Sequence, residues 1–224
     1  MEWMRLSAEE WNAILLSLRV ASVATIASLP LGILVALMLA RARFRGKALF
    51  DGLVHLPLVL PPVVTGYVLL VLFGRRGPIG SWLEAHLGIV FSFRWTGAAL
   101  ACAVMGFPLM VRAIRLQAAG TLGASPAWVF LTVTLPLALP GIVAGAVLCF
   151  AKALGEFGAT ITFVSNIPGE TQTIPAAIYN YTQVPDGDAG ALRLSVVAVA
   201  IALAALVASE WLARRSSGRG ARFE

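Results

Sequence analysis

The chain has 224 residues, of which 59% are hydrophobic and 12% charged, and its mean hydropathy is +0.86. Average soluble domains carry roughly 25% charged residues, so this chain has too few charged side chains to cover a water-soluble globule. A soluble enzyme, a disordered chain, a collagen and a coiled coil are therefore excluded. Because a membrane-spanning helix needs about 20 apolar residues, we expect an all-α polytopic membrane protein with about five spans.

The candidate spans are stretches with few or no charges. In chain order they cover residues 20–40, 52–74, 95–111, a segment from about 136 past Lys152 to about 164, and 194–209. The first is preceded by an amphipathic start over 11–19 and lacks a following signal-peptide cleavage site, so we expect it to be retained. Residues 171–184 leave room for a short or re-entrant helix, which would make six.

Lysine and arginine set the expected orientation. Most of the 17 basic residues fall in segments 41–47, 112–135 and 214–224. Since short cytoplasmic loops are enriched in Lys and Arg, the sequence predicts an outer N-terminus and a cytoplasmic C-terminus.

Prolines interrupt the second predicted span. The run HLPLVLPPVVTGY carries Pro57, Pro61 and Pro62, which lack backbone donors and predict a kink at membrane depth. Non-helical backbone at that depth must be covered by protein or line a water-filled path. Both a translocation-path helix and a bent packing helix fit this pattern.

Lys152 and Glu156 are the charged residues inside the fourth span, spaced i,i+4 so that they share a helix face and can pair. Ionisable residues inside a membrane usually face a bundle interior or a water-filled cavity. The pair is therefore either a structural contact or part of a polar lining. Elsewhere the sequence has no phosphate-binding loop, no HExxH and no catalytic constellation, so any energy source must be another chain or an ion gradient.

The block 117–136, QAAGTLGASPAWVFLTVTLP, is mildly apolar and lies on the predicted cytoplasmic side. By itself it fits an amphipathic interfacial helix or a helix that docks on a soluble partner. It resembles the EAA signature of ABC importer permeases, E-A-A-x(3)-G-x(9)-I-x-L-P, with Gln in place of Glu and Val in place of Ile at matching spacing. In that superfamily the segment is the coupling helix that sits on the cytoplasmic ATPase.

Two longer runs narrow the resemblance to molybdate permeases. They are HLPLVLPPVVTGYVLLVLFGRRGPIG and LGEFGATITFVSNIPGETQTIPAAIY, supported by FPLMVRAIRL and SEWLAR. Tungstate, sulfate and thiosulfate permeases share parts of these runs and remain alternatives for the cargo. One departure is that Leu116 directly abuts Gln117, where the family carries several more residues, so the loop before the coupling helix is shortened.

The resemblance implies a single permease domain over 1–224, with the type I importer fold and its cytoplasmic coupling segment at 112–135. It implies a multi-pass protein of the bacterial cytoplasmic membrane that works as a homodimer, with an ATPase dimer and an extracytoplasmic molybdate-binding protein. ATP and magnesium belong to the ATPase, so this chain is expected to bind no cofactor, no metal and no nucleic acid, and to be no enzyme itself. A stand-alone secondary anion transporter with Glu156 as its proton site is the alternative from another class.

Two sets of site residues follow from this interpretation. The coupling residues implied by the motif are Gln117, Ala118, Ala119, Gly123, Leu135 and Pro136. The hypothetical path or gate residues are Thr65, Lys152, Glu156, Thr160, Thr162 and Ser165.

Overall fold

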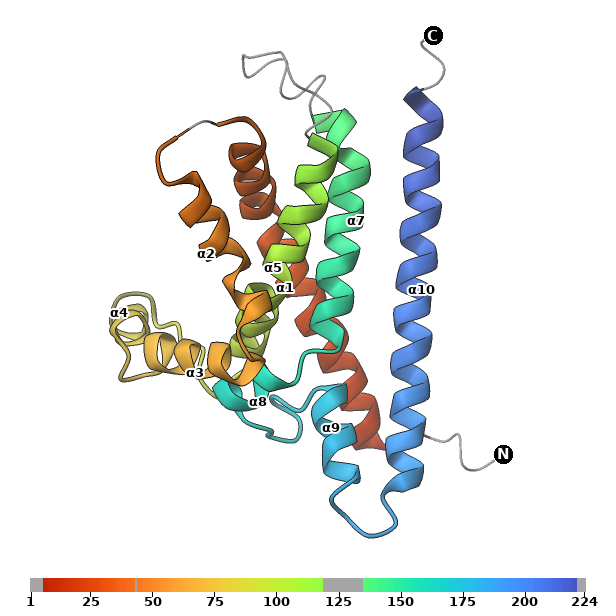
Figure 1. The fold of residues 1–224 in the computed structure, drawn as a ribbon. Coiled ribbons are helices and arrows are strands. Elements are labelled where there is room, and N and C mark those ends of the chain that lie inside the picture. The colour runs from red at the N-terminus through yellow and green to blue at the C-terminus, as the bar shows by residue number, and fades with distance from the viewer. Residues whose placement is uncertain (1–5, 43, 119–134, 221–224) are drawn as a thin grey trace.

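The computed structural model describes residues 6–42, 44–118 and 135–220, and throughout these residues the regular elements are α-helices (Figure 1). The all-α prediction is confirmed. In chain order the helices are α1 (Ala8–Arg41), α2 (Lys47–Val59), α3 (Pro62–Phe73), α4 (Pro78–Leu87), α5 (Trp95–Ala118), α7 (Leu135–Leu154), α8 (Gly158–Val164), α9 (Ile174–Tyr181) and α10 (Asp188–Gly220).

Within the described residues, 3 helices are long and apolar enough to cross a membrane, or up to 5 if each bent helix pair forms one span. The three lie in α1, α5 and α10, and the bent pairs are α2 with α3 and α7 with α8. The start of α1 and the end of α10 lie at opposite ends of the long axis (Figure 1). An odd number of crossings requires this arrangement, so the prediction of about five spans agrees with the structure.

The break between α2 and α3 is sharper than the predicted kink, because the two helices meet at 112°. Residues 52–74 are therefore two helices instead of one kinked span. Leu60 adopts φ −71° and ψ 143° before Pro61, the extended geometry that a residue preceding proline prefers. Pro62 then begins α3, where its missing N–H costs nothing.

The span predicted from about 136 to 164 is present as a bent helix pair. Helix α7 ends at Leu154, and α8 starts at Gly158 with a bend of 62° between them. The Glu156 carboxylate accepts a hydrogen bond from the backbone N–H of Ala159 at 2.9 Å. It satisfies one of the free donors at the new helix start, which explains why the chain bends here.

Helices α1, α5 and α7 form the centre of the molecule, and small side chains let them approach closely. Ala98, Ala101, Cys102 and Cys149 are fully buried there, so both cysteines are core residues. The short helix expected in 171–184 is present as α9, whereas α4 was not predicted.

Helix α10 is the peripheral element, with 11% of its apolar window buried inside the chain. It is tied to α1 near its start, where Arg193 donates to Glu10 at 2.8 and 3.1 Å. The Glu10 side chain is fully buried and also accepts from the backbone N–H of Ser7, closing a capping box at the start of α1. One carboxylate thus both caps α1 and anchors α10.

Candidate functional site

The two short helices α3 and α8 pack directly against each other at the end of the molecule where α1 begins (Figure 1). Their closest approach is at Gly66, where a Cβ atom would lie 2.5 Å from the carbonyl oxygen of Ala159. Gly66 therefore provides the room that brings α8 onto α3. The hydroxyl-bearing residues Thr65 and Thr160 come from these two helices, and both are buried.

The predicted ion pair is present, although Glu156 lies beyond the end of α7. Lys152 Nζ is 2.5 Å from Glu156 Oε2, while Oε1 accepts from Ala159. The Glu156 side chain is 1% exposed and that of Lys152 is 30% exposed. Because a buried carboxylate needs a partner and hydrogen bonds, this arrangement fixes the junction between α7 and α8.

The four threonine and serine hydroxyls take different positions. Thr160 Oγ1 donates to the carbonyl of Phe157 at 2.9 Å, and Thr162 Oγ1 donates to that of Gly158 at 2.9 Å. Thr65 Oγ1 is buried with no hydrogen-bond partner among the described residues. Ser165 is exposed at the end of α8, with φ +65°.

The structure therefore gathers Lys152, Glu156 and Thr160 at one junction and places Thr65 on the facing helix, while Thr162 and Ser165 lie further along α8. Lys152 is the one cation among the six predicted path residues, and it is already paired with Glu156, while the hydroxyls are neutral. Such a site can line a weakly binding path but cannot hold an oxyanion tightly, since tight binding calls for free Arg or Lys or several backbone N–H groups. Their path role stays a prediction.

Of the coupling residues, Gln117 and Ala118 end α5, and Leu135 and Pro136 begin α7. Ala119 and Gly123 lie outside the described residues. The end of α5 and the start of α7 lie at the same end of the molecule (Figure 1). Any force on the segment between them therefore acts directly on two central helices.

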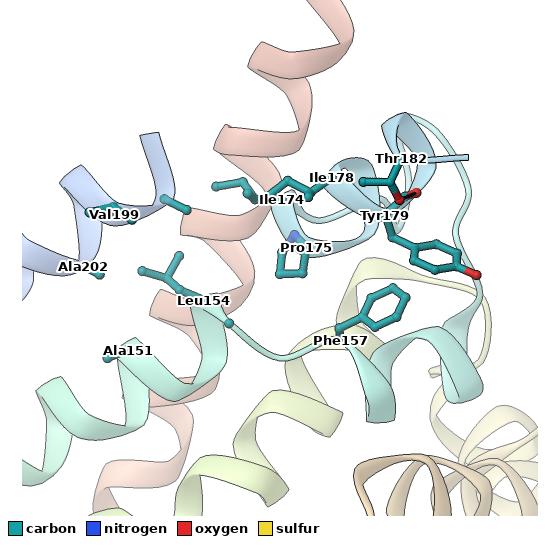
Figure 2. Close-up of a pocket in the computed structure, with 12 residues that line it drawn as sticks. Ala151, Leu154, Phe157, Ile174, Pro175, Ile178, Tyr179, Thr182, Val199 and Ala202 are labelled. Atoms are coloured by element: carbon teal, nitrogen blue, oxygen red, sulfur yellow. Dashed lines mark hydrogen bonds between the residues drawn. The ribbon is translucent and has the colours of Figure 1, made fainter. Parts of the chain in front are cut away.

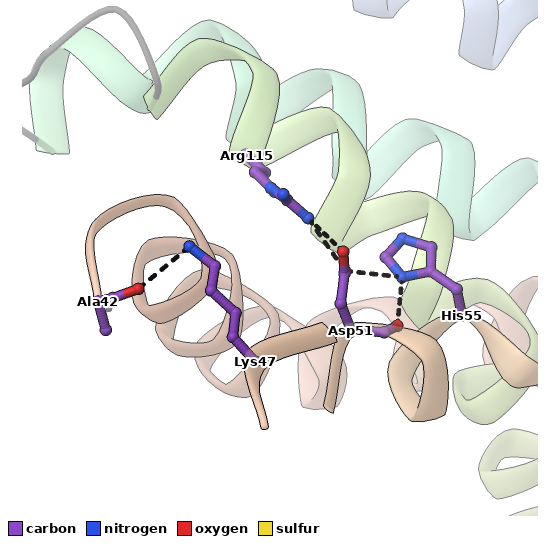
Figure 3. Close-up of polar contacts among 5 residues, drawn as sticks. All are labelled: Ala42, Lys47, Asp51, His55 and Arg115. Atoms are coloured by element: carbon purple, nitrogen blue, oxygen red, sulfur yellow. Dashed lines mark hydrogen bonds and ion pairs between the residues drawn. The ribbon is translucent and has the colours of Figure 1, made fainter. Parts of the chain in front are cut away.

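Sequence reasoning missed a polar cluster between α2 and α5 (Figure 3). Arg115 Nη1 donates to both carboxylate oxygens of Asp51, at 3.0 and 2.9 Å. His55 Nδ1 lies 2.9 Å from the carbonyl oxygen of Asp51 and 3.2 Å from its Oδ1. The i,i+4 spacing of Asp51 and His55 was a usable signal, but the sequence alone did not show that α5 lies opposite.

An apolar cavity of about 610 Å³ between α7, α9 and α10 was also missed (Figure 2). Leu154, Ile174 and Ile178 face it, and Phe157 lies against Tyr179 with ring centroids 5.2 Å apart. Of the described residues that line it, none carries a charged side chain. The cavity is therefore unsuited to an inorganic anion and instead marks how loosely α10 contacts the rest of the chain.

The backbone is similar to that of a solved bacterial ABC transporter involved in the import of the acidic polysaccharide alginate. The TM-score is 0.67, with 94% of this chain and 80% of that chain covered, at 19% sequence identity. At this identity the likeness shows the fold: that of an ABC importer permease.

Comparison of amino-acid sequences is more informative than this structural likeness. The chain is 59% identical over 229 residues to the molybdenum transport system permease protein ModB of Escherichia coli K12, covering 98% of this chain and 100% of that protein. It is 56% identical over 216 residues to the ModB protein of Haemophilus influenzae, covering 92% and 94%. A family model described as the inner membrane component of binding-protein-dependent transport systems matches residues 28–218. The chain therefore belongs to the family of binding-protein-dependent transport system inner membrane components.

Proposed function

We propose that this chain is the membrane subunit of an importer that moves molybdate across a bacterial cytoplasmic membrane. In this proposal it works as a homodimer, powered by two copies of a separate ATPase and supplied by an extracytoplasmic binding protein. The observation that carries the proposal is the 59% identity, over essentially the whole chain, to a molybdenum transport permease. ATP and magnesium bind to the ATPase, and this chain contributes no catalytic group.

The helix connections give a mechanical route for coupling. The segment 119–134, which carries most of the EAA spacing, links the end of α5 to the start of α7. Movement of that segment by the ATPase would shift α7 along its length. The far end of α7 is joined through Lys152 and Glu156 to α8, and α8 packs on α3. A push at one end of the molecule thus reaches the α3–α8 pair at the other, as in rigid-body transport cycles.

Charge supports the predicted orientation. The end with Arg112, Arg115 and Lys47 is basic, whereas at the opposite end Arg94 and Arg193 are accompanied by Glu9, Asp188 and the buried Glu10. Cytoplasmic segments are enriched in Lys and Arg. The coupling segment then faces the cytoplasm and the α3–α8 pair faces outward.

The predicted path residues are suited to weak rather than tight binding of an oxyanion. Thr65 and Ser165 offer neutral hydroxyls that would contact an oxyanion without retaining it, whereas the hydroxyls of Thr160 and Thr162 already donate to backbone carbonyls. A conduction path needs binding weak enough for the cargo to leave. Selection among molybdate, tungstate and sulfate is therefore assigned to the binding protein.

The test of cargo is uptake of radioactive molybdate, at nanomolar concentration, by a bacterial strain whose own molybdate permease gene is deleted and replaced by this one. We expect uptake that is restored by this gene, is competed by tungstate, and persists in a thousandfold excess of sulfate. Failure to restore uptake, with the protein present in the membrane, would contradict the proposal. Competition by sulfate as strong as that by molybdate would assign the chain to sulfate import instead.

A further inference from the structure

A cavity of about 420 Å³ opens between α2 and α5, at the end of the molecule where α5 ends. Among the described residues its lining consists of Asp51, His55, Arg112, Arg115 and Leu116. The polar members come from two helix faces: Asp51 and His55 are spaced i,i+4 on α2, and Arg112 and Arg115 are spaced i,i+3 on α5. Such spacings place side chains on one face of a helix, so the two faces converge on the cavity.

The charges in this cavity do not cancel. The Asp51 carboxylate is taken up by Arg115, at 2.9 and 3.0 Å, and by His55. Arg112 is exposed and forms no ion pair or side-chain hydrogen bond with the described residues. With neutral histidine the cluster therefore carries a net positive charge from Arg112.

The contacts with Asp51 also orient the Arg115 guanidinium for a further hydrogen bond. Bonds to both carboxylate oxygens hold the Arg115 guanidinium, which has further N–H groups beyond the one that contacts Asp51. The contacts of His55 Nδ1 with two oxygen atoms of Asp51 place the hydrogen of the neutral ring on Nδ1, so His55 helps to hold the Asp51 carboxylate and offers no further donor. The two guanidiniums around the cavity match the acceptors of a tetrahedral oxyanion, for which arginine is the usual protein partner.

We propose that this cavity binds a phosphate-like oxyanion group through Arg112 and Arg115, with Asp51 acting as the positioning residue for Arg115. The group can belong to a phospholipid headgroup or to a free inorganic anion. Leu116, which lines the cavity and is 72% exposed, offers an apolar contact that an acyl chain would use and a free anion would not. The site lies directly before the coupling segment, and it stands whether or not molybdate is the cargo.

The experiment uses the purified full-length chain in detergent. Phosphatidylglycerol binding is measured by native mass spectrometry, with diacylglycerol of the same acyl chains as the phosphate-free control, and inorganic phosphate binding by calorimetry. The test variant is Arg112→Gln, which leaves the contact between Asp51 and Arg115 in place. The matched control is Arg94→Gln, an exposed arginine at the opposite end of α5.

We expect Arg112→Gln to weaken binding of the preferred probe about tenfold, the effect of losing one charged hydrogen bond, and Arg94→Gln to leave it within about twofold. Loss of phosphatidylglycerol binding with no phosphate binding identifies a lipid site, and loss of phosphate binding identifies a free-anion site. Equal binding by the wild type and both variants, or binding of neither probe by the wild type, would overturn the inference.

Discussion

Replacing Gly66 by alanine tests whether α3 and α8 are packed as closely as the structure has them. The added Cβ would lie 2.5 Å from the carbonyl oxygen of Ala159 and 2.9 Å from its Cα. Both are backbone atoms, so no side-chain rotation can relieve the contact. Since ordinary contact begins at 3.4 Å, the helices must separate by about 0.9 Å.

Overpacking of this kind typically costs about 1–3 kcal/mol. Taking about 2 kcal/mol, and about 2–4 °C per kcal/mol for a chain of this size, Gly66→Ala should have a Tm about 4–8 °C lower than a helical glycine-to-alanine change that makes no such contact. Gly52→Ala is the matched control, because it makes the same change in α2, where no atom lies within 4 Å. Alanine is favoured over glycine in a helix by about 1 kcal/mol, so Gly52→Ala should leave the Tm unchanged or raise it.

The assay is thermal unfolding of both purified variants in one detergent, followed by tryptophan fluorescence, with uptake measured in parallel. We expect Gly66→Ala to lose both stability and uptake, because the separated helices lose their shared packing. A Tm for Gly66→Ala equal to that of Gly52→Ala would refute the close approach of α3 and α8, and with it the route from α7 to α3.

Three further changes have defined outcomes. Lys152→Met should lower the free energy of unfolding, measured by thermal unfolding, because it leaves the Glu156 carboxylate buried and unpaired. Removing one partner of a buried ion pair costs about 3–5 kcal/mol, and we expect the low end of this range because Lys152 is 30% exposed. Arg193→Met should likewise strand the buried Glu10 and detach α10 from α1, seen as faster hydrogen exchange in both helices. Gly123→Asp, inside the EAA spacing, should reduce ATP-dependent uptake at an unchanged Tm.

Each of these has its own control. The double variant Lys152→Met with Glu156→Gln should recover part of the lost stability, and no recovery would mean that the pair is not coupled. For α10, exchange rates equal to the wild type would show that Arg193 is not its anchor. Ala127→Asp changes a position that the motif leaves unspecified, so uptake lost equally in Ala127→Asp and Gly123→Asp would contradict the specific coupling role.

The apolar stretches were predictable because they follow from composition over about 20 residues, and the helices that cross the molecule lie where those stretches predicted. The breaks were less predictable. The prolines before α3 indicated a kink, but the 112° angle depends on α3 packing against α8, which is distant in sequence. The end of α7 at Leu154 depends on the hydrogen bond from the backbone N–H of Ala159 to the Glu156 carboxylate, which caps α8. Hydropathy along the sequence cannot predict such a contact.

The candidate site was likewise predictable from the sequence only in part. The i,i+4 spacing indicated that Lys152 and Glu156 would pair, and the pair is present. The cluster of Asp51 and Arg115 joins residues 64 positions apart, so one sequence without an alignment gave no means of finding it. Most of the EAA motif falls between α5 and α7. Its role in coupling to the ATPase stays a prediction from the sequence.

The measurement that tests the central claim most directly is molybdate uptake into proteoliposomes that contain this chain and its ATPase, with loaded binding protein outside and ATP inside, omitting one component at a time. We expect uptake only when all components and hydrolysable ATP are present. Uptake by this chain alone, driven by a proton gradient and indifferent to ATP, would contradict it and would favour a secondary transporter.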